Sequence, residues 1–155
     1  MTPSEVKLDA AQIARIMPMQ DPFLFVQSAV VSAQEATGTY HISGKEDFLR
    51  GHFKDNPIMP GTLMLEAIGQ LCVLHLLLGM GEGMARPADP KRTGLLSSES
   101  MRCINFCKPG DTLSMRIKPL RIRHPLGSYM GHMTRGQDKV AYVEELTLMF
   151  DYLPE

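Results

Sequence analysis

Residues 51–70, GHFKDNPIMPGTLMLEAIGQ, bring an imidazole, a carboxylate and an amide side chain into one short segment. Glu66 and Gln70 are four residues apart, which places them on the same face of a helix. A carboxylate among leucines is desolvated, which favours its protonated form, whereas a histidine such as His52 suits a base at neutral pH. The two groups predict an acid–base pair for proton transfer. The alternative is that both are hydrogen-bonded structural groups.

Pro60-Gly61-Thr62 stands where the helix that carries Glu66 should begin. A helix N-terminus offers unpaired backbone N–H groups and the positive end of the helix dipole. Because Gly61 has no Cβ, a ligand oxygen can approach the backbone closely there. Such donors can hold the oxygen of an enolate formed beside a thioester, and the spacing suggests this arrangement.

Residues 62–79, TLMLEAIGQLCVLHLLLG, are expected to form one long helix, ended by Gly79. The helix is apolar on every face, so it is either a membrane span or a buried core helix. Its length barely reaches that of a span, and it contains Glu66, Gln70 and His75. We therefore expect a central core helix and no membrane insertion, with His75 as a hydrogen-bonded core residue.

The remaining chain reads mostly as strands. Residues 9–17 suit a short amphipathic helix, and residues 22–43 one long strand or a strand pair broken near Gln34–Glu35. A Gly- and Pro-rich loop is expected at 79–92. Four apolar-rich runs follow, near 93–106, 111–123, 127–135 and 139–152, with turns at 109–111 and 136–139. This order predicts an α+β fold with an antiparallel sheet wrapped on one buried helix.

The chain has 155 residues, with 16 Lys+Arg against 17 Asp+Glu, and this length suits a single domain over 1–155. The net charge of −1 removes the usual electrostatic argument for a nucleic-acid partner. Three cysteines are too few and too irregular for a disulfide framework or a zinc site, so we expect reduced thiols and no metal. The N-terminus has no apolar run of signal length, which favours a cytoplasmic location.

The 51–70 segment resembles the signature of the (3R)-hydroxyacyl-[acyl-carrier-protein] dehydratases of bacterial fatty acid synthesis, G-H-F-P-x-x-P-I-M-P-G-x-L-x-x-E-A-x-x-Q. Met17-Pro18 with 22–26, PFLFV, and 106–111, FCKPGD, are similar to two further family segments. The resemblance implies a single hotdog fold and a hydro-lyase without a cofactor. It also implies an acyl carrier protein as the bearer of the substrate and a homodimer or higher oligomer.

Roles follow from the resemblance residue by residue. His52 would remove the C2 proton of a 3-hydroxyacyl thioester, and Glu66 would protonate or orient the departing hydroxyl. The amide of Gly61 would polarise the thioester carbonyl, and in the family each site takes His from one subunit and Glu from the other. The remaining residues expected to bind or shape the site are Phe53, Ile58, Met59, Pro60 and Gln70. A Glu rather than an Asp on the helix resembles the dehydratases without isomerase function.

The chain departs from the family pattern at Lys54, at Met19-Gln20-Asp21 and at Gln27. It therefore resembles a divergent member, serving fatty acid synthesis or a specialised lipid or polyketide-type pathway. Two alternatives remain open: a hotdog acyl thioesterase and a non-catalytic acyl-binding or partner subunit.

A cationic group in the second half of the chain is a candidate partner surface. It consists of Lys108, Arg116, Lys118, Arg121, Arg123 and His124. Alternation along a strand sends such side chains to one side or the other. They form either a basic patch for an acidic carrier protein or a phosphopantetheine phosphate, or a solvated sheet face.

Overall fold

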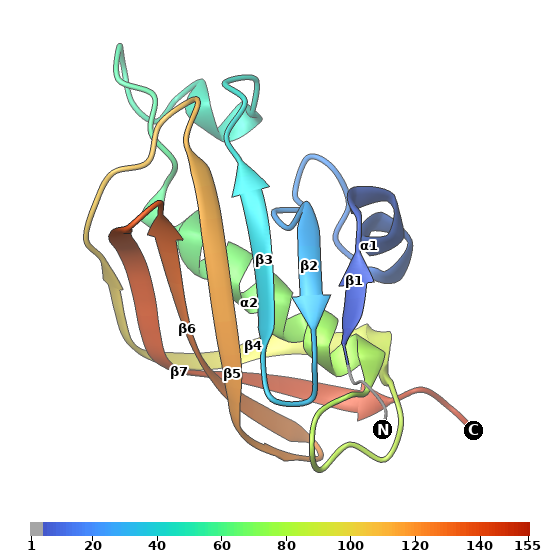
Figure 1. Ribbon diagram of the computed structural model, residues 1–155. Coiled ribbons are helices and arrows are strands. Elements are labelled where there is room, and N and C mark those ends of the chain that lie inside the picture. Colours follow the sequence, from blue (N-terminus) through green and yellow to red (C-terminus); the bar gives the residue numbers. More distant parts are fainter. Residues whose placement is uncertain (1–4) are drawn as a thin grey trace.

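The computed structural model describes residues 5–155, which form one antiparallel sheet and a long helix (Figure 1). In chain order the elements are β1 (Val6–Leu8), α1 (Ala10–Ile16), β2 (Ser28–Val31), β3 (Ala36–His41), a 3₁₀ turn (Asp47–Leu49), α2 (Gly61–Leu78), β4 (Ala88–Cys103), β5 (Thr112–Arg123), β6 (Leu126–Arg135) and β7 (Asp138–Tyr152). The strands lie in the order β1-β2-β3-β5-β6-β7-β4, so β1 and β4 are the two edges.

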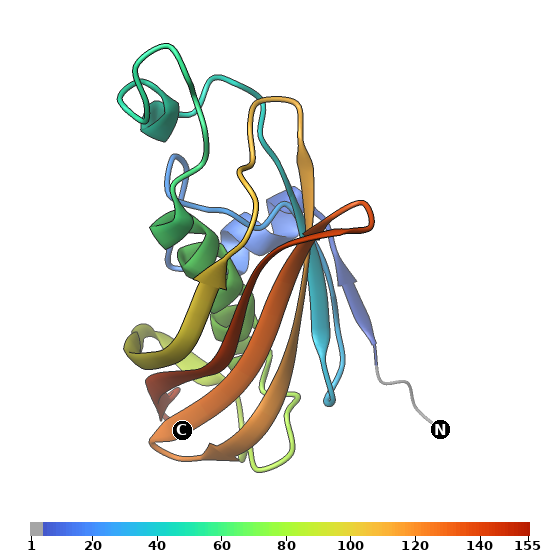
Figure 2. The same cartoon turned by 90° about the vertical axis from the view of Figure 1, so that its left-hand side faces the viewer.

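The sheet curves around α2, which lies against its inner face (Figure 2). Alternate residues of β5, β6 and β7 point inward and are buried against the helix. The expected α+β hotdog fold, a sheet wrapped on one long helix, is therefore confirmed.

Helix α2 begins one residue earlier and ends one residue earlier than the pattern predicts. Gly79 ends it in the left-handed conformation, with φ 65° and its N–H bonded to the carbonyl of Leu76. The helix is long and apolar enough to cross a membrane, but two thirds of it is buried inside this fold. The apolar side chains of α2 are thus covered by the sheet that curves around it.

Several expected elements are confirmed and two boundaries are wrong. The short helix over 9–17 is observed as α1, with Asp9 and Gln12 forming a capping box.

Within 22–43, β2 and β3 form the expected strand pair, but residues 22–27 are not a strand. The N–H of Phe25 there bonds to the side chain of Gln70 rather than to a neighbouring strand. The loop expected over 79–92 ends before Ala88, where β4 begins, because Ala88 pairs with Tyr152 at the C-terminal end of β7.

His75 is fully buried and hydrogen-bonded, as expected for a core residue. Its Nδ1 accepts from the hydroxyl of Tyr129 at 2.9 Å, and its Nε2–H donates to the carbonyl of Ser32, also at 2.9 Å. Burial lowers the pKa of this imidazole, which keeps it neutral. The residue joins the end of α2 to β6 and to the turn between β2 and β3.

Candidate active site

The loop between the 3₁₀ turn and α2 holds His52 by hydrogen bonds within itself. The carbonyl of His52 accepts from the N–H of Ile58 at 2.9 Å, and the peptide groups of Phe53 and Asn56 bond to each other at 2.7 and 3.0 Å. The N–H of Met59 donates to the carbonyl of Cys107 at 2.8 Å, which attaches the loop to the segment before β5. The loop is thus anchored at the end that leads into α2.

The imidazole of His52 has a defined tautomer. Its Nδ1 lies 3.0 Å from the carbonyl oxygen of Ile58, and since a carbonyl only accepts, the proton is on Nδ1. Nε2 carries the lone pair and has no hydrogen-bond partner within residues 5–155. The ring of Phe53, itself half exposed, stacks on the imidazole with ring centroids 3.6 Å apart. This is the arrangement that a histidine base requires.

Glu66 is oriented by Gln70, one turn further along α2. The Nε2 of Gln70 donates to Glu66 Oε2 at 3.0 Å and to the carbonyl of Phe23 at 2.9 Å, while its Oε1 accepts from the N–H of Phe25 at 2.7 Å. Gln70 is fully buried and Glu66 is partly exposed. One carboxylate oxygen is therefore fixed, and Oε1 of Glu66 has no hydrogen bond within the described part of the chain.

Gly61 is the first residue of α2, after Pro60 at the cap position, and its N–H lies in the first turn, where helical amides have no intrahelical acceptor. A Cβ at this position would lie 2.7 Å from the sulfur of Cys103, so no larger residue fits without a shift. This contact alone gives the glycine a structural reason, independent of any ligand. The sequence pattern did not indicate Cys103, because it is 42 positions away from Gly61 in the chain.

His52 and Glu66 line two separate cavities in the single chain. The His52 cavity, about 340 Å³, is lined by Phe53, Ile58, Met59, Gly61, Met64 and residues 103–106. The Glu66 cavity, about 130 Å³, is lined by Met19, Thr62, Leu65, Gly69, Val73, residues 93–95, Leu146 and Leu148. No residue lines both. The structure therefore brings His52 together with four of the expected binding residues, and Glu66 together with Gln70, but it does not bring His52 and Glu66 into one cavity.

The cysteines are free thiols. Burial raises the pKa of Cys103 and that of Cys72, and it raises the pKa of Cys107 to about 11. All three are therefore protonated at neutral pH and are poor nucleophiles. Within residues 5–155, no three His, Cys, Asp or Glu side chains gather into a possible metal site.

Comparison with known proteins places the chain in a family. The family model of the FabA-like domain matches residues 17–144. The chain is 36% identical over 126 residues to the 3-hydroxyacyl-[acyl-carrier-protein] dehydratase FabZ of Bacillus licheniformis, covering 80% of this chain and 83% of that one. It is 31% identical over 147 residues to the FabZ of Thermomicrobium roseum, covering 93% and 94% of the two chains.

Solved structures share the fold at lower identity. The dehydratase heterocomplex ApeI:P from Xenorhabdus doucetiae superposes with a TM-score of 0.71 at 17% identity, over 90% of each chain. A thioesterase from Haemophilus influenzae superposes with a TM-score of 0.65 at 12% identity, over 96% of this chain and 94% of that one. From the family match over residues 17–144 and the identity to FabZ, we conclude that the chain belongs to the FabA-like family, as a divergent relative of the 3-hydroxyacyl-[acyl-carrier-protein] dehydratases.

Proposed function

We propose that the protein is a hydro-lyase that converts (3R)-hydroxyacyl-carrier-protein thioesters to trans-2-enoyl thioesters. The observation that carries the proposal is the pair of oriented groups in the family motif. Nδ1–H of His52 is held by a carbonyl, which frees Nε2, and one oxygen of Glu66 is held by Gln70, which frees the other. An imidazole base and a carboxyl acid are what a β-elimination of water requires.

The reaction needs three contributions from the chain. Nε2 of His52 takes the proton from C2 of the substrate, and the amide of Gly61 stabilises the oxygen of the resulting enolate. Glu66, in its protonated form, gives its proton to the C3 hydroxyl, the C3–O bond breaks, and water leaves as the C2–C3 double bond forms. His52 then gives up the proton taken from C2 and Glu66 takes up one, directly or through solvent, so that both groups are restored and the charges balance.

The separate cavities support an active site that is shared between two copies of the chain. Each chain offers a His52 cavity and a Glu66 cavity, and different parts of β4 contribute to the two: Leu95 lines the Glu66 cavity, and Cys103, at the end of the strand, lines the His52 cavity. A two-fold axis near the middle of this part of β4 would set the two copies of the strand antiparallel. The Cys103 end of one copy, with its His52 cavity, would then lie beside the Leu95 region of the other copy, with its Glu66 cavity.

The surface along β4 has the character of an uncovered interface. Leu95 pairs with the buried Leu148 and so points to the α2 side of the sheet, yet 54% of it is exposed. Leu96 on the same strand is exposed too, as are Ile104 and Phe106 just after the strand ends. A long edge strand with apolar side chains is a site for pairing with another chain. We propose a homodimer across this edge.

We also propose, from the resemblance to carrier-protein dehydratases, that an acyl carrier protein presents the substrate and that the protein works in the cytoplasm. Fatty acid biosynthesis is the process in which its relatives act, and the departures at Lys54 and at Met19-Gln20-Asp21 favour a specialised lipid or polyketide-type pathway.

Activity on defined thioesters tests the reaction. The protein is incubated with 3-hydroxyacyl and with saturated acyl thioesters, and enoyl product and free thiol are measured. We expect enoyl formation without thiol release, and a loss of at least about a hundredfold in kcat for both His52→Ala and Glu66→Gln. Thiol release without enoyl formation would establish a thioesterase instead. Turnover that survives both substitutions would remove the assigned roles, and no turnover of any thioester by the wild type would indicate a non-catalytic subunit.

Mixing the two inactive variants tests the shared site. If His52 and Glu66 come from different copies, a mixed dimer of His52→Ala and Glu66→Gln contains one intact site and one site without either group. Random exchange then restores about a quarter of the wild-type activity, since half the dimers are mixed and each has one working site. A site contained within one chain would give no recovery after exchange.

A further inference from the structure

The outer face of β5 carries four cations in one line, which the proposed reaction does not use. Arg116, Lys118, Arg121 and Arg123 form this stripe, called here the β5 stripe. In an unbroken strand, residues 116 and 118 would face one side of the sheet and residues 121 and 123 the other. The buried residues Met115, Ile117 and Ile122 show instead that all four cations face outward.

A β-bulge causes this alignment. Pro119 pairs with Tyr129, whereas Arg121 pairs with Ser128, so Leu120 is an extra residue in β5 with no partner on β6. The extra residue shifts the alternation by one position and turns Arg121 and Arg123 to the outer face. Four like charges on one strand face repel each other. Their alignment therefore does not itself stabilise the fold.

The neighbours of the β5 stripe do not neutralise it. On β6 the residues opposite the four cations are His132, Met130, Ser128 and Leu126. Arg116 forms an ion pair with Glu35, but within residues 5–155 no ion pair involves Lys118, Arg121 or Arg123. Glu82 lines a hollow with Lys118 and Arg121 without an ion pair to either, and Glu144 and Glu145 lie one strand further away, on β7.

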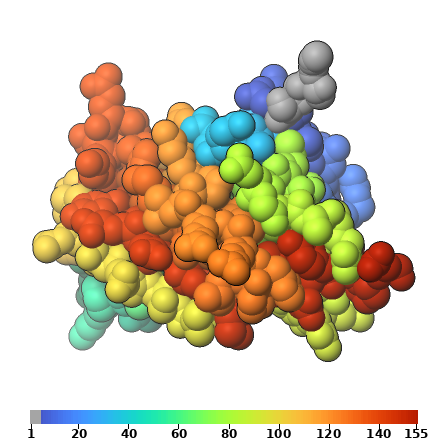
Figure 3. All heavy atoms as spheres, turned by 90° about the horizontal axis from the view of Figure 1, so that it is seen from below, coloured from blue at the N-terminus to red at the C-terminus, as the bar shows by residue number. Residues whose placement is uncertain are grey.

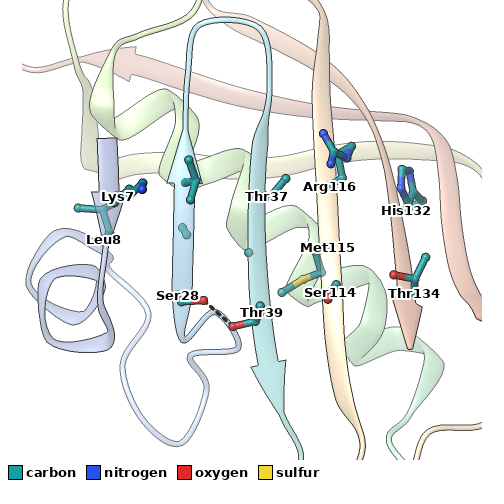
Figure 4. A pocket seen from close by; sticks show the side chains of 13 residues that line it. Lys7, Leu8, Ser28, Thr37, Thr39, Ser114, Met115, Arg116, His132 and Thr134 are labelled. Atoms are coloured by element: carbon teal, nitrogen blue, oxygen red, sulfur yellow. Dashed lines mark hydrogen bonds between the residues drawn. The ribbon is translucent and has the colours of Figure 1, made fainter. Parts of the chain in front are cut away.

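The field around the stripe is positive at His132. This imidazole lies beside Arg116 on the neighbouring strand, as Figure 4 shows. Its pKa is lowered, first by burial and then by the charges of Arg116, Lys139 and Lys118. The charges that contribute to the shift are all cations, and two of them, Arg116 and Lys118, belong to the stripe.

Apolar side chains lie along one side of the stripe. Leu126 and Met130 on β6 and Met149 on β7 are exposed, and Leu126 pairs directly with Met149. The β5–β6 segment, orange in Figure 3, occupies the middle of the lower side of the molecule, beside the loop that follows α2. Cations with an adjoining apolar strip match a partner helix that has an acidic face next to an apolar face.

The shape of the surface favours a protein helix over a flat bilayer. The stripe is bordered by hollows of about 610 Å³ beside Arg116 and about 500 Å³ beside Lys118 and Arg121. From Arg116 to Arg123 the strand runs about 20 Å. A helix of about 14 residues spans the same length, and its side chains can enter the hollows, whereas a membrane surface cannot.

We infer that the β5 stripe, with Leu126, Met130 and Met149 beside it, docks an acidic amphipathic helix of a partner protein. The stripe lies on the face of the sheet turned away from α2, so a partner bound there leaves the His52 and Glu66 cavities open. This inference goes beyond the proposed dehydration and does not depend on it.

Peptide binding tests the inference. The probe is a labelled helical peptide of about 14 residues with a glutamate stripe beside a leucine stripe, and its twin carries glutamine for glutamate. Binding is followed by fluorescence anisotropy at low salt and at about 0.5 M NaCl. We expect the glutamate peptide to bind at least about tenfold more tightly than its twin, and salt to weaken it.

Charge reversal locates the site. Arg121→Glu with Arg123→Glu should weaken the glutamate peptide at least about tenfold, and Met149→Gln should weaken it further. Lys45→Glu with Lys91→Glu is the matched control, because both lysines are exposed, lie outside the stripe and give the same change in net charge. Circular dichroism confirms that both double variants are folded.

Three outcomes would overturn the inference. They are equal binding of the two peptides, equal weakening by the stripe and control variants, and no binding of the glutamate peptide. Vesicles of phosphatidylglycerol that bind the wild type but not the Arg121→Glu/Arg123→Glu variant, without peptide binding, would assign the stripe to a membrane surface instead.

Discussion

Gln70 is the residue whose replacement tests most directly how the carboxylate of Glu66 is held. Its amide makes three hydrogen bonds, to Glu66 and to the backbone at Phe23 and Phe25, and it is fully buried. Gln70→Leu keeps the approximate volume and removes all three bonds. The substitution therefore separates hydrogen bonding from packing.

The magnitude follows from the groups left without partners. The buried N–H of Phe25 and the partly buried carbonyl of Phe23 lose their side-chain partner, and a fully buried group left so costs about 1–3 kcal/mol. We expect the free energy of unfolding to fall by about 3 kcal/mol, which corresponds to a decrease in Tm of roughly 6–12 °C for a chain of this size. Because Glu66 also loses its orienting donor, kcat should fall at least about tenfold with little change in KM.

Thermal unfolding at fixed protein concentration and steady-state kinetics measure these two effects. Gln27→Leu is the matched control, since Gln27 is exposed and makes one bond through Oε1, to the N–H of His41. The control should cost less than about 1 kcal/mol and leave kcat unchanged. The reasoning is refuted if Gln70→Leu is no less stable than Gln27→Leu, or if its kcat equals that of the wild type.

Three further predictions concern other contacts. Gly61→Ala should destabilise the protein, because the added Cβ would lie 2.7 Å from the sulfur of Cys103. Adding Cys103→Ala should restore thermal stability. A Gly61→Ala variant as stable as the wild type would contradict the contact. Tyr129→Phe should cost about 1–3 kcal/mol in denaturant unfolding, because Nδ1 of His75 loses its donor, and an unchanged midpoint would argue against the bond. Burial lowers the pKa of His75 from its ordinary value of 6.5, so the unfolded chain binds the proton more tightly than the folded protein does. The free energy of unfolding should therefore fall as the pH drops below about 6.5. In a pH series of urea titrations, His75→Gln should flatten this slope.

Local patterns were sufficient for the elements and for the segment that carries the chemistry. The run 62–79 had to be a helix because its residues favour one and Gly79 ends it, and α2 follows within one residue. The strands β5, β6 and β7 follow from apolar-rich runs bounded by turn residues, with the clearest alternation near the end of the chain. His52, Gly61 and Glu66 were recognisable because the motif is contiguous, so its residue types and spacing are visible without a fold.

Local patterns do not specify which residues pair over long distances in the chain. Gln70 bonds to backbone groups 45 and 47 residues away, and nothing near Gln70 specifies those partners. Residues 22–27 have strand-like composition, yet Gln70 takes the N–H of Phe25, which an extended pairing would need. β4 begins at Ala88, within a stretch rich in Gly and Pro, because the end of β7 provides its partner.

The types of the reacting groups are thus a property of the sequence, whereas their environment is a property of the tertiary structure. The motif names His52 and Glu66, but only the packing of α2 on the sheet assigns them to separate cavities. The charges of β5 are visible in the chain, but only the mismatch with β6 at Leu120 turns all four to one face. The physical reason is the same in both cases: side-chain periodicity is set by neighbouring residues, whereas register and cavities are set by partners distant in the chain.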